Sequence, residues 1–256
     1  MPESLLNLEH LSVQFGGLRA LSNFNFSLNQ GDLLGLIGPN GAGKTTAFNV
    51  VTGVYRPTEG FITFQGQSIA GLPPFKINRR GIARTFQNIR LFGALTVLEN
   101  VLVGFNQSVT HGFVGSILRT PGHQREDTRH DAEAMQLLAT FGLADKADHH
   151  AASLPYGDQR RLEIARALAT RPKVLLLDEP GAGMNPQEKV ELMRLIRFIR
   201  DRFKVGIWLI EHDMKLVMSV CERITVLDHG ETIAVGTPAE VQCNPDVIEA
   251  YLGEPA

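Results

Sequence analysis

The sequence predicts an α/β protein with a mainly parallel sheet, an N-terminal antiparallel β-subdomain and an inserted α-helical subdomain. Three observations lead to this fold class. Continuous apolar runs at 33–37, 174–177 and 206–210 predict strands covered on both faces, which is typical of parallel sheets. Alternating runs near the start predict strands with one covered face, and the middle of the chain carries helical patterns only.

The N-terminal segment predicts the antiparallel β-subdomain, because its apolar residues alternate with mostly polar neighbours. These residues are Leu11, Val13 and Phe15, then Phe24, Phe26 and Leu28, and further on Ile62 and Phe64. Near the other end of the chain, residues 224–227 and 232–235 predict a late β-hairpin around the turn 228–231.

A glycine-rich segment directly follows the first apolar run and matches the pattern G-x-x-x-x-G-K-[ST]. A strand that ends, a loop whose N–H groups converge and a helix that begins together form a phosphate-binding site. We expect Lys44 to reach the β- and γ-phosphates and the Thr45 hydroxyl to bind Mg²⁺. The pattern predicts binding of a nucleoside triphosphate through Gly38, Pro39, Asn40, Gly41, Ala42, Gly43, Lys44, Thr45 and Thr46.

The second apolar run ends in Asp178 and Glu179, and this pair indicates the reaction. Ligands of open parallel sheets bind beyond the carboxyl ends of the strands, so both carboxylates should face the same nucleotide. Asp178 is expected to hold Mg²⁺, directly or through water. Strand alternation would point Glu179 to the opposite side, toward an attacking water, and we interpret it as the general base of hydrolysis.

The third apolar run is followed by Glu211, His212 and Asp213. A histidine at this strand tip is placed to hydrogen-bond the γ-phosphate and to orient Glu179 without titrating. His212 is therefore a third candidate catalytic residue.

The middle of the chain, from about residue 88 to 152, carries helical signals. Thr96 and Glu99 have the spacing of a capping box that begins a helix. A second helix is expected from about Arg125 to Phe141, with Gly142 at its end. The stretch between these helices contains the apolar residues Phe113, Val114, Ile117 and Leu118.

The composition limits the location and the partners. The chain has 256 residues, 43% of them hydrophobic, which suffices for one large domain or two lobes. A net charge of −2 favours no nucleic-acid partner. No apolar run approaches the roughly 18 residues that span a bilayer. The N-terminus also lacks the pattern of a signal peptide, so a cytoplasmic location is expected.

Residues 154–168, just upstream of the Asp178 strand, complete a pattern that resembles the ATP-binding subunits of ABC transporters. The signature segment of that family is a short glycine-containing loop that opens a helix. Within the family, the sequence is most similar to the ATP-binding subunits of branched-chain amino acid importers. This closer similarity rests on Arg-Thr-Phe-Gln at 84–87, Pro-Tyr-Gly-Asp-Gln at 155–159, the inserted stretch and residues 244–253.

The resemblance implies roles for further residues. Gln87 corresponds to the glutamine that contacts the Mg²⁺ site and takes part in catalysis. Phe15 corresponds to the aromatic residue that stacks on adenine, residues 182–185 to the D-loop, and His212 to the switch histidine. The signature residues expected to contact a nucleotide are Tyr156, Gly157, Asp158 and Gln159.

The same resemblance implies a single ATPase domain over residues 1–256. Its nucleotide-binding core and β-subdomain would comprise 1–87 and 160–240, its helical subdomain with the signature loop 88–159, and its C-terminal tail 241–256. A head-to-tail dimer is also implied, in which the start of the signature helix closes on the γ-phosphate held by the other subunit. Both a homodimer and a heterodimer remain open.

Two positions depart from the family pattern. Pro155 stands where the family has its signature serine, and Asn185 stands where it has the D-loop aspartate. Proline has neither a hydroxyl nor an N–H group, so one donor to the partner's nucleotide is absent. This departure makes an asymmetric pair with a different ATPase subunit a reasonable hypothesis.

The function implied by the resemblance is hydrolysis of ATP to power an importer from the cytoplasmic face of the membrane. The implied partners are transmembrane permease subunits and, indirectly, a solute-binding protein. We expect the segment from Phe86 to Leu95, with the apolar set at 113–118, to dock on a permease. The alternative is that Leu91 and Phe92 fill the core of the helical lobe.

Three other functions share parts of the pattern. The ATPase of a lipid or lipopolysaccharide export ABC system has the same core. A soluble ABC protein of DNA repair or translation would usually carry a coiled coil, a metal hook or a second ATPase copy. A small-molecule kinase would need an acceptor pocket and a lid, and would not need Gln87, the signature helix and His212 together. The importer is therefore our first interpretation.

Overall fold

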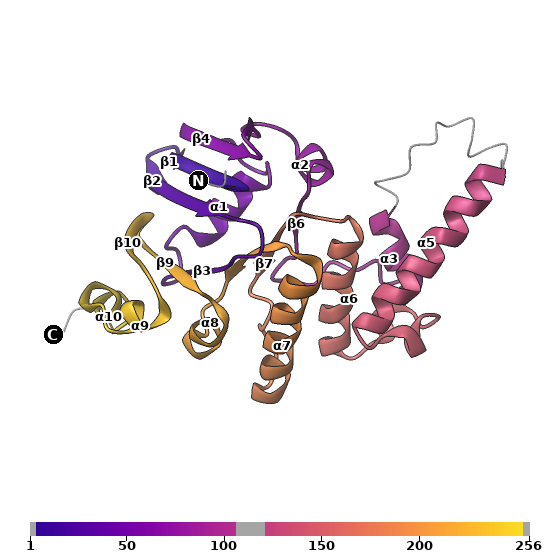
Figure 1. Ribbon diagram of the computed structural model, residues 1–256. Coiled ribbons are helices and arrows are strands. Elements are labelled where there is room, and N and C mark those ends of the chain that lie inside the picture. Colours follow the sequence, from indigo (N-terminus) through magenta and orange to yellow (C-terminus); the bar gives the residue numbers. More distant parts are fainter. Residues whose placement is uncertain (1–3, 106–120, 253–256) are drawn as a thin grey trace. The chain divides into compact units, whose positions relative to one another are not determined.

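The computed structural model describes residues 4–105 and 121–252 (Figure 1). The chain divides into two compact units, residues 1–87 with 173–256, and residues 88–172. We call them the sheet unit and the helical unit. The boundary expected at residue 159 falls inside α6 (Tyr156–Ala169), and the helical unit instead contains this helix whole. The reason is that a helix is one cooperative element, and α6 packs along α3 (Val97–Phe105) of the same unit.

A four-stranded antiparallel sheet forms the first layer of the sheet unit. Its order is β2-β1-β4-β5, with β1 at Leu6–Phe15, β2 at Leu18–Leu28, β4 at Glu59–Phe64 and β5 at Gln67–Ser68. The alternating residues are buried as the pattern predicts, apart from Phe15, whose side chain is exposed. The predicted N-terminal β-subdomain is therefore confirmed.

The second layer is a six-stranded sheet in the order β10-β9-β3-β8-β7-β6. All neighbouring strands are parallel except β10, which pairs antiparallel with β9. The strands are β3 (Leu33–Ile37), β6 (Ile82–Arg84), β7 (Val174–Asp178), β8 (Gly206–Ile210), β9 (Arg223–Asp228) and β10 (Glu231–Gly236). The three predicted central strands and the late hairpin are confirmed, and β9 additionally joins the sheet beside β3.

Both faces of the central strands are covered, as their continuous hydrophobicity predicts. In Figure 1, α7 (Pro186–Phe203) and α8 (Met214–Val220) lie on one side of the six-stranded sheet, and α1 (Lys44–Val51) with the four-stranded sheet lies on the other. A Cβ at Gly35 of β3 would lie 2.9 Å from a side-chain carbon of Val217, so α8 approaches the sheet closely there. The remaining helices of this unit are α2 (Pro74–Arg80), α9 (Pro238–Gln242) and α10 (Pro245–Leu252).

Trp208 of β8 lies in the core between the two sheets. Its ring has no exposed surface and stacks on Phe26 of β2, with centroids 4.0 Å apart. Phe48 of α1 lies against the same indole at 4.8 Å. Aromatic burial of this size contributes strongly to a core, so this cluster joins the two sheets through α1.

The described residues of the helical unit form α3, α5 (Pro121–Thr140), α6 and the short 3₁₀ helices η2 (Ala144–Lys146) and η3 (Ala151–Ser153). The predicted capping box is present, because Thr96 N–H donates to Glu99 Oε2 at 2.7 Å and Glu99 N–H donates to Thr96 Oγ1 at 3.1 Å. The end of α5 is also as predicted, with Gly142 at φ 68° just beyond it. Phe113, Val114, Ile117 and Leu118 lie outside the described residues.

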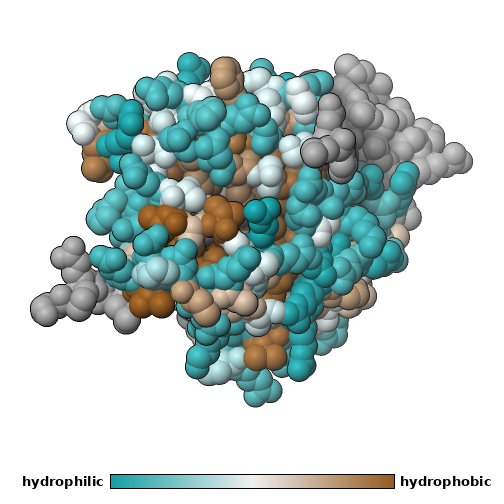
Figure 2. Space-filling view, turned by 60° about the vertical axis from the view of Figure 1, so that its left-hand side comes forward, coloured by the Kyte–Doolittle hydropathy of each residue, from teal (hydrophilic) through white to brown (hydrophobic). Residues whose placement is uncertain are grey.

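No helix within residues 4–105 and 121–252 is long and apolar enough to cross a membrane. On the face shown in Figure 2, hydrophobic residues occur as separate small groups among hydrophilic ones. Such scattering is ordinary for a protein surface and gives no reason to assign a function to this face.

Candidate active site

The phosphate-binding loop connects β3 to α1 and is fixed by two close backbone contacts. Gly38 and Gly43 have φ of 148° and 102°. A Cβ at Gly38 would lie 2.0 Å from the carbonyl oxygen of Leu227, and one at Gly43 would lie 2.5 Å from that of Ala20. Only glycine fits such contacts at these φ values. Within the predicted loop, Gly38, Ala42 and Lys44 are buried, Pro39, Gly43 and Thr46 are half-buried, and Asn40, Gly41 and Thr45 are exposed.

Lys44 is the first residue of α1, and its ammonium lies inside this loop. Nζ donates to the carbonyl oxygens of Gly38 at 2.6 Å and Pro39 at 2.7 Å. Burial lowers the pKa of Lys44, and the charges of Glu179 and Asp178 act in the opposite direction. The positively charged Lys44 ammonium is therefore near the carboxylates of Asp178 and Glu179. There it would compensate the negative charge of a bound triphosphate.

Glu179 is contacted by both of the other predicted catalytic residues. The Gln87 amide Nε2 donates to Glu179 Oε2 at 2.7 Å. Nδ1 of His212 lies 3.5 Å from the same oxygen. Two residues from separate segments thus contact one carboxylate, an arrangement that would control the position of the predicted base.

The expected reason for the orientation of Glu179 is wrong. Strand β7 ends at Asp178, so Glu179 does not alternate within a strand. Its φ is 45°, in the left-handed region, and its N–H donates to the carbonyl oxygen of Ile210 at 2.9 Å. A non-glycine residue held there carries backbone strain, which accumulates at functional sites. The hydrogen bond to β8 and this strained turn, rather than the period of the strand, direct the side chain.

Asp178 has a partner that sequence reasoning did not assign. Arg84, the last residue of β6, donates from Nη2 to Asp178 Oδ2 at 2.6 Å, and both side chains are almost completely buried. The two residues are far apart in sequence, and only the pairing of β6 with β7 brings them together.

Phe15 has a neighbour that the sequence did not reveal. Its ring meets Tyr55 edge to face, with centroids 5.0 Å apart, and both rings are partly exposed. The two rings form an aromatic corner at the end of β1, which offers a flat base more contact than Phe15 alone. Tyr55 stands in an irregular segment after α1, where no periodicity marks it.

The predicted signature residues are at the start of α6 in the helical unit. Gln159 donates from its side chain to the carbonyl oxygen of Leu154 at 2.8 Å, and Asp158 accepts from Lys146 at 2.6 Å. The hydrogen bond that Lys146 donates to Asp158 raises the pKa of Lys146. These side chains support the loop from within the unit, while Tyr156 is exposed and Gly157 half-buried. Tyr156 is therefore the most accessible side chain among the predicted signature residues.

Glu211, the residue before His212, contacts the segment that follows Glu179. Oε1 of Glu211 accepts from the Gly181 N–H at 2.7 Å, and Glu211 is only 1% exposed. Burial raises the pKa of this carboxyl, against the opposing effect of the Gly181 hydrogen bond. Asn185, which departs from the family pattern, has a structural role. It forms a capping box with Glu188 at the start of α7.

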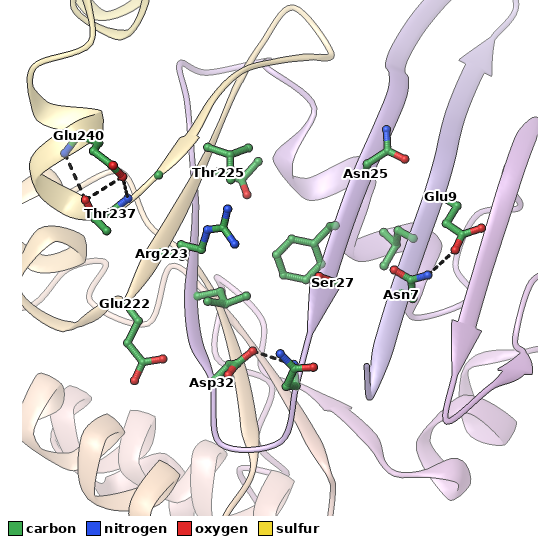
Figure 3. A pocket seen from close by; sticks show the side chains of 16 residues that line it. Asn7, Glu9, Asn25, Ser27, Asp32, Glu222, Arg223, Thr225, Thr237 and Glu240 are labelled. Atoms are coloured by element: carbon green, nitrogen blue, oxygen red, sulfur yellow. Dashed lines mark hydrogen bonds between the residues drawn. The ribbon is translucent and has the colours of Figure 1, made fainter. Parts of the chain in front are cut away.

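A separate groove of about 890 Å³ lies between β1, β2 and the β9–β10 hairpin (Figure 3). None of the predicted site residues lines it. Its polar side chains bond to close neighbours in sequence, such as Asn7 to Glu9 and Thr237 to Glu240. They do not converge on a common point, so we assign no function to this groove.

The fold and the site define a P-loop ATPase. A parallel sheet carries the phosphate loop on β3, the acidic pair on β7 and the histidine after β8, and all three meet at one edge. The sequence profile of the family described as "ABC transporter" matches residues 21–182. The chain therefore belongs to the ABC transporter family, and it is an ATPase that binds ATP. A second profile, described as "Branched-chain amino acid ATP-binding cassette transporter", matches residues 231–256.

Similar proteins extend over almost the whole chain. The high-affinity branched-chain amino acid transport ATP-binding protein LivG of Salmonella typhimurium is 48% identical over 99% of this chain and 100% of its own length. BraF of Pseudomonas aeruginosa, which has the same description, is 46% identical with the same coverage. The lipopolysaccharide export system ATP-binding protein LptB of Haemophilus influenzae is 35% identical over 98% of each chain.

Solved structures agree with the fold. The crystal structure of the ADP conformation of an ATP-binding cassette from an ABC transporter superposes with a TM-score of 0.85 at 31% identity. It covers 98% of this chain and 100% of that chain. A nucleotide-free cassette gives a TM-score of 0.84 at 30% identity, with the same coverage.

Proposed function

We propose that this chain is the ATP-binding subunit of an importer for branched-chain amino acids, located at the cytoplasmic face of the membrane. The observation that carries the proposal is its 48% identity to LivG over the full length of that protein. The match of residues 231–256 to the branched-chain profile supports it at the end of the chain. Lipopolysaccharide or lipid export remains the second candidate, because LptB is 35% identical over nearly its whole length.

We propose that Mg²⁺ accompanies ATP at the edge of the six-stranded sheet. The residues that would hold it are Thr45, Gln87 and Asp178, which offer a hydroxyl, an amide and a carboxylate oxygen, the donors that Mg²⁺ prefers. Among the described residues, no group of three or more His, Cys, Asp and Glu side chains forms a metal site, so phosphate oxygens would complete the coordination. The cation would neutralise charge that develops on the phosphates.

The residues of this chain then divide the work of hydrolysis. Lys44 and the phosphate loop bind the β- and γ-phosphates, and Phe15 with Tyr55 contacts the adenine. Glu179 takes a proton from the attacking water, which a positioned carboxylate does efficiently when its orientation is fixed. Gln87 and His212 hold that carboxylate through the contacts to Oε2 described above. His212 is exposed and is placed to reach the γ-phosphate as well.

We also propose that two ATP-binding subunits close head to tail, with the start of α6 facing the partner's nucleotide. A helix N-terminus attracts phosphate through its N–H groups and its dipole. Pro155 precedes this helix and provides no side-chain cap. A composite site made with this segment therefore lacks one hydroxyl donor, which favours pairing with a different ATP-binding subunit that supplies a complete signature.

The docking surface for the permease is proposed to include Phe92. Its ring is 49% exposed and lies over the Arg166 guanidinium, 5.2 Å from the ring centroid. Its backbone is fixed by Asn100, which accepts from the Phe92 N–H and donates to the Phe92 carbonyl, both at 3.0 Å. An exposed aromatic ring on a rigid backbone is more consistent with contact to a partner than with packing in the core of the helical unit.

Copurification tests the function directly. The tagged full-length chain is isolated from detergent-solubilised membranes, its membrane partners are identified, and the complex is reconstituted in liposomes with the solute-binding protein. We expect ATP-dependent uptake of leucine, isoleucine or valine. If the complex transports lipopolysaccharide or another lipid and takes up no amino acid, the exporter function would be supported and the importer function rejected.

A further inference from the structure

Arg84 is a buried arginine that the hydrolytic mechanism above does not use. It ends β6, and its register partner on β7 is Leu176, two residues before Asp178. Its Nη2 donates to Asp178 Oδ2 at 2.6 Å, with side-chain exposures of 6% and 7%. The proposed Mg²⁺ ligand therefore has an arginine as its immediate neighbour.

Further contacts fix the Arg84 guanidinium from several sides. Nη1 donates to Asn49 Oδ1 at 2.7 Å and to Thr52 Oγ1 at 3.3 Å, both near the end of α1. The guanidinium also lies over the rings of Phe48 at 5.5 Å and Phe86 at 5.0 Å. With Asp178 included, the planar guanidinium is held by three acceptors and two aromatic faces, and it has little freedom to turn.

This arrangement orients one side of the Asp178 carboxylate. Oδ2 accepts the hydrogen bond from Arg84, and no other side-chain hydrogen bond of Asp178 occurs within the described part of the chain. Hydrogen bonds to a metal-binding carboxylate from outside the coordination sphere set its orientation and strengthen its binding. A lysine would supply charge without the planar geometry.

We propose that Arg84 is a positioning residue for the magnesium site, which acts by fixing the Asp178 carboxylate toward the cation. The inference rests on the proposed role of Asp178 in binding Mg²⁺. The segment 84–87 then positions both acidic residues at the β7 tip, because Arg84 bonds Asp178 and Gln87 bonds Glu179. A merely structural arginine would join β6, β7 and α1 without affecting the cation.

The test separates binding of the nucleotide from binding of the metal. Equilibrium binding of a fluorescent ATP analogue to the full chain is measured with EDTA and across a Mg²⁺ titration, in a Glu179→Gln background. For Arg84→Met we expect nucleotide affinity in EDTA within about twofold of the parent. The Mg²⁺ midpoint is the Mg²⁺ concentration that gives half of the Mg²⁺-dependent change in nucleotide affinity. We expect this midpoint to rise by about 10- to 100-fold. Arg84→Lys should give a smaller rise.

Two further variants keep the test decisive if Arg84→Met does not fold. Asn49→Ala retains the arginine but removes one of its anchors, so the Mg²⁺ midpoint should shift in the same direction by a smaller factor. Arg200→Met is the matched control. Arg200 belongs to α7 of the same unit and pairs with Asp201 and Glu222, so the Mg²⁺ midpoint of this variant should stay unchanged. Folded Arg84 or Asn49 variants with the parent midpoint would overturn the proposal.

Asp178→Asn distinguishes failure of this proposal from failure of the proposed function. If Asp178 binds Mg²⁺, this variant should lose most of the Mg²⁺-dependent gain in nucleotide affinity. A full gain in Asp178→Asn would show that the metal site is elsewhere. If Asp178→Asn loses the Mg²⁺-dependent gain and Arg84→Met keeps the parent Mg²⁺ midpoint, the role of Arg84 is rejected and the role of Asp178 stands.

Discussion

The side-chain amide of Gln87 donates a hydrogen bond of 2.7 Å to Oε2 of Glu179. Gln87 is also the last residue of the sheet unit, and it lies within the segment from Phe86 to Leu95 that we propose to dock on a membrane partner. A displacement of that segment by a membrane partner would therefore change the contacts of Glu179, the proposed general base.

Lys44→Ala and Glu179→Gln should separate binding from hydrolysis. In the proposed role, Lys44 compensates phosphate charge in the ground state, so Lys44→Ala should largely abolish MgATP binding. In the proposed role, Glu179 acts on water only in the transition state, so Glu179→Gln should retain binding and slow turnover by about 10² to 10⁴. Equilibrium ATP binding and single-turnover hydrolysis measure the two effects. Near wild-type hydrolysis in Glu179→Gln would show that another group is the base.

Pro155→Ser should strengthen the ATP-bound dimer. The new hydroxyl can donate one charge-assisted hydrogen bond to a γ-phosphate, at best about 1.5 to 3 kcal/mol. Light scattering with ATP, in the Glu179→Gln background, measures the dimer population. Serine can also cap α6, and Pro155→Asp controls for this, because aspartate caps a helix but repels phosphate. Equal dimerisation in Pro155→Ser, Pro155→Asp and the parent would exclude a contribution from the hydroxyl.

Phe92→Asp should uncouple hydrolysis from transport. The ring is exposed, so the isolated subunit should fold and hydrolyse ATP, while copurification with the permease and amino acid uptake should fall at least tenfold, as expected for an interface hot spot. Phe198→Asp is the matched control, since Phe198 of α7 is similarly exposed at 46%. Full uptake with Phe92→Asp, or loss of folding, would remove Phe92 from the docking surface.

The buried carboxyl of Glu211 should make stability depend on pH. Because burial raises its pKa above the ordinary value of 4.5, the folded state binds this proton more tightly than the unfolded state. The stability contributed by Glu211 is thus complete below pH 4.5 and is lost as pH rises through the folded pKa. Glu211→Gln keeps an acceptor for the Gly181 N–H but does not titrate.

Urea unfolding of both proteins over a range of pH measures this effect. The free energy of unfolding of Glu211→Gln, relative to wild type, should increase as pH rises above 4.5. Other titrating groups are common to both proteins and cancel in the difference. A difference that stays constant with pH would mean that Glu211 has the same pKa folded and unfolded.

The sequence predicts the parts of this fold that depend on local pattern. Long apolar runs specify the three central strands, and the glycine pattern specifies the phosphate loop, since each signal lies within a few residues. Strand β6 was not predicted, because three residues, Ile82–Arg84, are too few to show a period. It exists through its pairing with β7, which is a tertiary interaction.

The candidate site shows the same division. The residue types of Glu179, Gln87 and His212 follow from motifs, and the structure brings these side chains together. The left-handed turn at Glu179 and the Arg84–Asp178 pair depend on contacts between segments distant in sequence, which no motif records. Likewise, the bonds of Asp158 and Gln159 within the helical unit become visible only once the loop is folded.

Trp208 gives the sheet unit a spectroscopic signal of its own. It is the single tryptophan of the chain, and its indole is enclosed by Phe26 and Phe48. Tryptophan emission therefore arises from the sheet unit alone, whereas far-ultraviolet circular dichroism arises from helices of both units. If the two signals change at the same temperature, the units melt as one cooperative body. If the dichroism changes first, the helical unit loses its order while the indole remains enclosed.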